Sequence, residues 1–120
     1  MYLGIDFGTS GARGVVINSA GDILAEVRYP FEMSLGSDLI KCWQTALFIL
    51  LEQVNRELRE EVTRIAINGT SSTVLLCDGA GNPVDAPLLY NDARGAGMRE
   101  RLKKIAPPNH TVLSATSSLV

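Results

Sequence analysis

Residues 1–17 read MYLGIDFGTSGARGVVI, two apolar runs separated by a turn of small residues. The first run, residues 2–5, leads to Asp6, and the second, residues 15–17, is β-branched. Between them lie residues that tolerate a tight turn, namely Gly8, Thr9, Ser10 and Gly11. The pattern predicts two strands joined by a tight turn, with Asp6 at the end of the first strand.

A turn of this composition suits a phosphate group. Backbone N–H groups converge where two strands meet at small residues, and such concave arrangements bind anions. Asp6 would repel a phosphate directly, so its place beside the turn is explained if Mg²⁺ lies between them, often through water. The residues alone leave open an ordinary hairpin in which Asp6 caps its own turn. The glycine spacing matches neither the dinucleotide motif G-x-G-x-x-G nor a P-loop.

The composition is that of an ordinary globular protein. The 120 residues make one domain or part of one, with 46% apolar and 20% charged residues. A net charge of −2 gives no electrostatic reason to expect nucleic acid or an anionic membrane as a partner. Cys42 and Cys77 have neither metal-ligand spacing nor enough partners for a disulfide framework. We therefore expect reduced thiols in a cytoplasmic protein.

Beyond the hairpin, apolar and polar residues alternate over 23–29 and predict a third strand, which completes an antiparallel three-stranded meander. Ser37 or Asp38 can cap a long helix that runs to about Glu60. Spacings of three and four place one apolar stripe on this helix, and we expect its tryptophan in the core. The stripe consists of Ile40, Trp43, Leu47, Leu50, Val54 and Leu58.

The second half of the chain predicts two further strands, over 64–68 and 74–77, and a helix over 94–105 with a basic, solvated face. A polar run, residues 69–73, separates the two strands. Small polar residues in such positions are often turn formers, but they also suit the positioning of sugar hydroxyls. The element order predicts an α/β domain, a mixed sheet with helices packed against it.

The motif D-x-G-T-S-x-x-R, here Asp6, Gly8, Thr9, Ser10 and Arg13, resembles the first phosphate motif of the actin-like sugar kinases of the FGGY family. The resemblance implies one lobe of an actin-like, ribonuclease-H-like fold, with ATP and Mg²⁺ as cofactors. It implies that Asp6 is catalytic and organises the metal and the phosphates. The turn, including Gly11, would cradle the β- and γ-phosphates, and Arg13 would add positive charge.

Residues 65–94, IAINGTSSTVLLCDGAGNPVDAPLLYNDAR, are similar to a later part of the FGGY N-terminal lobe. The resemblance implies that Ser71, Ser72 and Asp92 hold the sugar. Glycerol and xylulose kinases of the family carry Arg-Glu or Met-His where this chain has Ser71 and Ser72, which argues against simply naming glycerol or xylulose as the substrate. Residues 68–73 and 105–116 resemble most the cyanobacterial and plant kinases whose sugar is D-ribulose.

The resemblance covers essentially the whole chain but only the N-terminal part of a longer kinase. We therefore expect residues 1–120 to be a partial N-terminal lobe that is inactive alone, with the general base and the adenosine site in a second lobe. The apolar residues Leu113, Leu119 and Val120 lead us to expect self-association through a truncated side. The predicted function of the complete enzyme is ATP-dependent phosphorylation of a pentulose, D-ribulose in the first place. The alternatives are xylulose or another sugar of the family, or a non-catalytic actin-like module that binds nucleotide.

Overall fold

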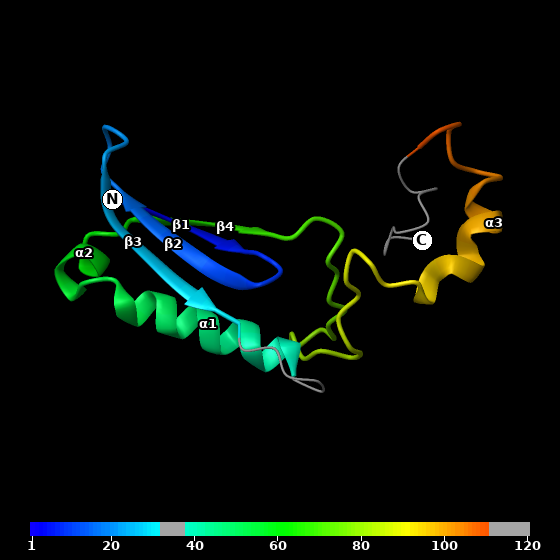
Figure 1. Ribbon diagram of the computed structural model, residues 1–120, viewed down its shortest axis with the longest axis horizontal. Coiled ribbons are helices and arrows are strands. Elements are labelled where there is room, and N and C mark those ends of the chain that lie inside the picture. Colours follow the sequence, from blue (N-terminus) through cyan, green and yellow to red (C-terminus); the bar gives the residue numbers. More distant parts are fainter. Residues whose placement is uncertain (32–37, 111–120) are drawn as a thin grey trace. The chain divides into compact units, whose positions relative to one another are not determined.

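The computed structural model describes residues 1–31 and 38–110, and the chain divides into two compact units, Met1–Gly69 and Thr70–Val120. The first unit contains a four-stranded sheet in the order β3-β2-β1-β4 (Figure 1). The first three strands pair antiparallel, and β4 pairs parallel to β1. The predicted mixed sheet with a three-stranded meander is therefore confirmed. Its strands are β1 (Tyr2–Phe7), β2 (Gly11–Ile17), β3 (Ile23–Pro30) and β4 (Arg64–Gly69).

One face of the sheet is covered by helix α1 (Leu39–Gln53), which packs against β2 and β3 (Figure 1). Strand side chains alternate between the faces, so every second residue of β1 and β2 enters the core. Full burial of each aliphatic side chain contributes roughly 1.5–3 kcal/mol. Trp43 packs against this core as a partly buried residue, in agreement with its predicted role. The core consists of Leu3, Ile5, Ala12, Val16, Phe31, Ala46, Leu50 and Val54.

The start of α1 is fixed by Asp38, one of the two predicted caps. Its Oδ1 atom accepts hydrogen bonds from the backbone N–H groups of Ile40 and Lys41, both at 3.1 Å. These bonds satisfy two donors that the first helical turn leaves without a partner. A cap of this kind stabilises a protein by about 1 kcal/mol.

The prediction of one helix to Glu60 is wrong, because the chain breaks after α1 and begins a second helix, α2 (Arg56–Glu60). Val54 takes an extended conformation and is only 2% exposed, so it enters the core as the helix ends. Asn55 then caps α2, its Oδ1 accepting from the N–H of Glu57 at 2.8 Å. The apolar stripe continues through the break, and the hydrophobic spacing therefore did not reveal it.

In the second unit, the predicted strand over 74–77 is not a strand. Val74 and Cys77 form only isolated bridges, to Leu88 and Pro83. Between the members of the second bridge, Asp78 closes a turn by accepting hydrogen bonds at 2.8–2.9 Å from backbone N–H groups of residues 80 and 82. Proline lacks an N–H group, so Pro83 cannot extend a ladder on its donor side.

The predicted helix over 94–105 is shorter than expected. Arg94–Met98 forms a 3₁₀ helix, and only Arg99–Leu102 (α3) is α-helical. Gly95 and Gly97 explain the difference, since each glycine disfavours an α-helix by about 1 kcal/mol relative to alanine.

Among the residues that the structure describes, no helix is long and apolar enough to cross a membrane. Cys42 and Cys77 are free thiols.

A stability prediction arises at Gly11, where β2 begins opposite the end of β3. A Cβ atom at this position would lie 2.7 Å from the carbonyl oxygen of Tyr29 and 3.1 Å from Cα of Pro30. We expect Gly11→Ala to lower the free energy of unfolding by roughly 1–3 kcal/mol, because the contact is with backbone that must shift. Urea unfolding followed by the fluorescence of Trp43 measures this change.

Gly4→Ala is the matched control, since a Cβ at Gly4 would meet nothing within 4 Å. We expect this variant to change stability by less than about 0.5 kcal/mol. Equal losses in the two variants would show that the close approach to β3 is not what requires glycine at position 11.

Candidate functional site

The turn between β1 and β2 is held by backbone hydrogen bonds. The N–H of Gly8 donates to the carbonyl oxygen of Gly11 at 2.9 Å, and the N–H of Phe31 donates to the carbonyl oxygen of Ser10 at 3.0 Å. The second bond ties the turn to the end of β3. Thr9 and Ser10 are exposed at the tip. The structure thus brings the predicted phosphate residues together in one small, fixed turn at the end of the two central strands of the sheet.

Asp6 lies beside this turn at the carboxyl end of β1, and two side chains engage its carboxylate. Asn68 Nδ2 donates to Asp6 Oδ1 at 2.9 Å, and Arg13 Nε lies 3.5 Å from Asp6 Oδ2. Both neighbours come from strands that flank β1, because Asp6 pairs with Arg13 on β2 and with Asn68 on β4. The carboxylate is therefore held by the sheet on both sides.

The ion pair between Asp6 and Arg13 is loose and solvated. The two side chains are 39% and 64% exposed. An exposed ion pair of this kind contributes about 0–1 kcal/mol. Arg13 can therefore leave Asp6 for an incoming anion at little cost, and Asp6 can take another cation in its place.

The donor set around Asp6 fits Mg²⁺ that arrives with a nucleotide. Within residues 1–31 and 38–110, no three His, Cys, Asp or Glu side chains are grouped so that they could hold a metal ion. Mg²⁺ keeps several waters and is commonly bound through one or two carboxylates together with substrate phosphates. A single carboxylate beside a phosphate-binding turn meets that description, whereas a site built from protein ligands alone would need more donors.

The predicted sugar residues lie in the second unit. Ser71 and Ser72 belong to the turn after β4, which closes with a hydrogen bond from the N–H of Thr73 to the carbonyl oxygen of Thr70 at 3.2 Å. Ser72 has a φ of 62°, in the left-handed region that non-glycine residues seldom occupy. Such conformations cost of order 1–3 kcal/mol and gather at functional sites.

Asp92 is fixed by Arg94, two residues later. Arg94 donates to Asp92 Oδ2 from Nε at 2.8 Å, with Nη2 at 2.7 Å, and its backbone N–H donates to Oδ1 at 2.8 Å. These hydrogen bonds lower the pKa of Asp92, chiefly through the Arg94 side chain, so the carboxylate is ionised at neutral pH. Arg94 also donates to the carbonyl oxygen of Pro87 at 2.8 Å, which anchors the pair to its own loop.

Residues 1–119 match the N-terminal domain of the FGGY family of carbohydrate kinases. This chain belongs to the FGGY family. A xylulose kinase from Staphylococcus xylosus is 28% identical over 108 residues, which cover 85% of this chain and 22% of the relative. A glycerol kinase from Nostoc sp. is 28% identical over 111 residues, again 85% of this chain and 22% of the relative. The FGGY chain thus spans about a fifth of the length of these curated relatives.

A solved structure supports the fold of this FGGY domain. The crystal structure of Plasmodium falciparum glycerol kinase with ADP aligns with a TM-score of 0.69 at 17% identity, covering 98% of this chain and 26% of that chain. The likeness confirms the predicted lobe of the actin-like fold of FGGY sugar kinases. The relatives phosphorylate xylulose or glycerol according to their names, so the D-ribulose branch stays a prediction.

Two residues without a predicted role form hydrogen bonds with predicted site residues of the FGGY domain. Asn68 binds Asp6, and Arg94 binds Asp92. The first could have been found because residue 68 is the polar end of an apolar strand, and the carboxyl ends of parallel strands meet at one edge. The second had a weaker signal, an opposite charge two positions from Asp92.

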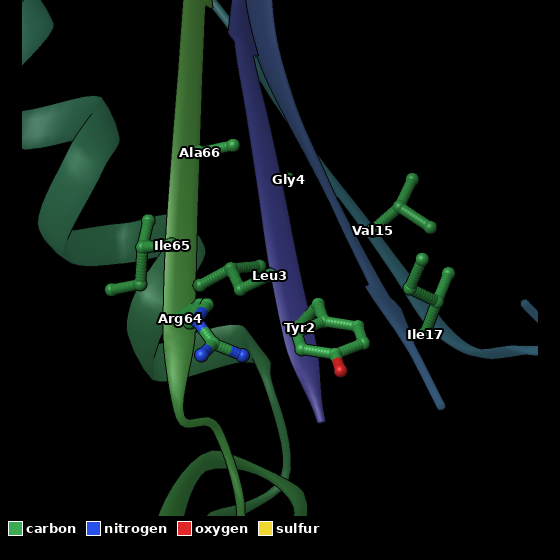
Figure 2. Close-up of a pocket in the computed structure, with 8 residues that line it drawn as sticks. All are labelled: Tyr2, Leu3, Gly4, Val15, Ile17, Arg64, Ile65 and Ala66. Atoms are coloured by element: carbon green, nitrogen blue, oxygen red, sulfur yellow. The ribbon is translucent and has the colours of Figure 1, made fainter. Parts of the chain in front are cut away.

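A hollow of about 470 Å³ on the first unit of the FGGY domain is separate from these residues. Figure 2 shows its lining, which comes from the first residues of β1 and β4 and from Val15 and Ile17 of β2. Tyr2 and Arg64 supply its polar side-chain groups, and none of the predicted site residues lines it. Its apolar lining offers no group for phosphoryl transfer.

Proposed function

We propose that the protein to which this FGGY domain belongs transfers the γ-phosphoryl group of ATP to a hydroxyl group of a pentulose, with D-ribulose as the preferred sugar. The observation that carries the proposal is the Asp6 carboxylate, held by Asn68 and Arg13 at the carboxyl end of β1 and beside the 8–11 turn. A carboxylate would repel a phosphate bound at the turn, so its position there is explained if a cation lies between the two groups. The alternative, a turn-capping Asp, is disfavoured because Asp6 Oδ1 accepts its hydrogen bond from Asn68 on β4 and not from the 8–11 turn.

A protein catalyses phosphoryl transfer mainly by positioning the reacting groups and by stabilising the charge on the phosphates. Backbone N–H groups and the hydroxyls of Thr9 and Ser10 are suited to bind phosphate oxygens at the turn. Arg13, which is exposed and weakly held, is suited to move toward the phosphates. Asp6 would hold the hydrated Mg²⁺, which neutralises charge on the phosphates when it is bound.

The sugar assignment rests on the second unit. Ser71 and Ser72 present short side chains that can donate and accept hydrogen bonds, as sugar hydroxyls require. The left-handed φ of Ser72 supports a functional reason for this residue, because the strain needs compensation. Asp92 is ionised and oriented by Arg94, which suits a carboxylate that accepts from sugar hydroxyls. D-xylulose is the second candidate, because several similar relatives are xylulose kinases.

The test compares catalytic efficiency among sugars for the full-length protein. ATP and Mg²⁺ are supplied with D-ribulose, D-xylulose or glycerol, and ADP formation is followed with and without the sugar. We expect kcat/KM for D-ribulose to exceed that for D-xylulose by about ten-fold or more, because a buried sugar hydroxyl that loses its hydrogen-bond partner costs about 1–3 kcal/mol. A preference for D-xylulose would correct the sugar and leave the kinase standing, whereas ADP formation that no sugar accelerates would contradict the kinase itself.

A further inference from the structure

We infer that Asn68 is a positioning residue for Asp6, which fixes Asp6 Oδ1 so that Oδ2 is the oxygen presented to the hydrated metal–nucleotide complex. The inference rests on the proposed phosphoryl transfer. It concerns a residue that neither the motif D-x-G-T-S-x-x-R nor the predicted sugar cluster includes.

The contact between Asn68 and Asp6 is set by regular structure. Strands β1 and β4 pair in unbroken parallel register from Tyr2 with Arg64 to Phe7 with Gly69, and Asp6 faces Asn68 in this ladder. Residues that face each other across a parallel ladder project on the same side of the sheet. Positions on strands hold a functional group more accurately than positions on loops.

Asparagine has the chemistry that this position requires. Its amide donates to Asp6 Oδ1 at 2.9 Å without neutralising the carboxylate. A lysine or arginine there would compete with the metal for the charge, and a second carboxylate would repel Asp6. The opposite amide orientation would set the Asn68 oxygen against the carboxylate oxygen, so the donor orientation is the favourable one.

Arg13 cannot perform this task. Its Nε atom lies 3.5 Å from Asp6 Oδ2, and its side chain is 64% exposed. This contact engages the oxygen that Asn68 leaves open, and it is weak enough to be exchanged for a metal-bound water. The two neighbours of Asp6 thus have separate roles: Asn68 orients the carboxylate, and Arg13 occupies the exchangeable side.

The experiment measures Mn²⁺ binding to the full-length protein in the presence of ADP, by the electron paramagnetic resonance signal of free Mn²⁺. We expect Asn68→Ala to weaken Mn²⁺ binding by about ten-fold, the lower end of the effect of losing a group that orients a metal-binding side chain. The same variant should lower kcat and raise the Mg²⁺ concentration for half-maximal rate, with the KM for the sugar unchanged. Asn68→Gln keeps an amide donor and should restore part of the Mn²⁺ affinity.

Asn82→Ala is the matched control. Asn82 Nδ2 donates to Asp78 Oδ2 at 3.0 Å, another exposed pair of an asparagine and an aspartate, in a turn of the second unit. We expect this variant to bind Mn²⁺ as the wild type does. Wild-type Mn²⁺ affinity in Asn68→Ala, or an equal loss in Asn82→Ala, would overturn the inference.

The same assays separate this inference from the proposed function. A wild-type protein that phosphorylates no sugar would contradict the proposed function, whatever the Asn68 variants do. A wild-type protein that phosphorylates a sugar, with a Mg²⁺ dependence that Asn68→Ala leaves unchanged, would contradict only the role of Asn68.

Discussion

Asp6→Asn is expected to lower the turnover of sugar phosphorylation by about 10²–10³-fold in the full-length protein, the usual loss when one preorganised electrostatic group is removed. The change keeps the shape of the side chain and removes its charge. The oxygen of the new amide can still accept from Asn68, whose Nδ2 lies 2.9 Å from Asp6 Oδ1. The missing charge can no longer hold Mg²⁺ near the phosphates in the reacting geometry.

The fold should survive Asp6→Asn. The ion pair that the change removes joins Asp6 and Arg13 at 3.5 Å between exposed side chains, and such pairs contribute about 0–1 kcal/mol. Steady-state kinetics at several Mg²⁺ concentrations, with a melting curve of the same sample, measure both effects. Near-normal turnover with an unchanged Mg²⁺ requirement would return Asp6 to the role of a turn cap.

Ser72→Ala is expected to lower kcat/KM for D-ribulose by roughly ten-fold or more, and Ser71→Ala is expected to have a similar or smaller effect. Loss of a hydroxyl that binds the substrate leaves a buried sugar group without a partner, at a cost of about 1–3 kcal/mol. The larger effect is expected at Ser72, the position at which the resemblance to the FGGY kinases implies a substrate contact. The KM for ATP should stay nearly constant, because the 8–11 turn is a separate element.

Ser72→Gly separates the hydroxyl from the backbone strain. Alanine at position 72 keeps the cost of a φ of 62°, whereas glycine removes both the strain and the hydroxyl. Equal kinetic losses in Ser72→Ala and Ser72→Gly would assign the effect to the hydroxyl. Full efficiency toward D-ribulose in both alanine variants, or a loss of ATP affinity instead, would make residues 69–73 a strand-connecting turn without a substrate role.

The parts of the fold that the sequence predicted are those with strong local signals. The small residues of the 8–11 turn, the alternation over 23–29 and the cap at Asp38 each act within a few residues of the structure they produce. The break at Asn55 was missed because an apolar stripe continues through it. Helix α1 ends where Val54 becomes extended, and Asn55 Oδ1 then begins the next helix by accepting from the N–H of Glu57. The predicted strand over 74–77 failed because its apolar residues have no neighbouring strand with which to form a ladder in the described residues.

In the candidate site, too, the residues that are close in sequence were predicted together, and the contact between distant residues was not. Asp6, Arg13 and the turn between them are close in sequence, and the motif placed them together correctly. Asn68 lies 62 residues from Asp6, and their contact follows from the parallel pairing of β4 with β1. The sequence marks residue 68 as the polar end of an apolar strand, but the pattern of one strand does not specify which strand will lie beside it, so the pairing with Asp6 came from the folded domain.

We propose that Asp6 and the 8–11 turn serve phosphoryl transfer to a sugar. The most direct measurement follows ³¹P nuclear magnetic resonance of the full-length protein with ATP, Mg²⁺ and D-ribulose. We predict that the γ-phosphorus signal of ATP is replaced by that of a sugar phosphate ester together with ADP. Conversion of ATP to ADP and inorganic phosphate alone, or no conversion with D-ribulose, D-xylulose or glycerol, would contradict the claim and favour a non-catalytic module that binds nucleotide.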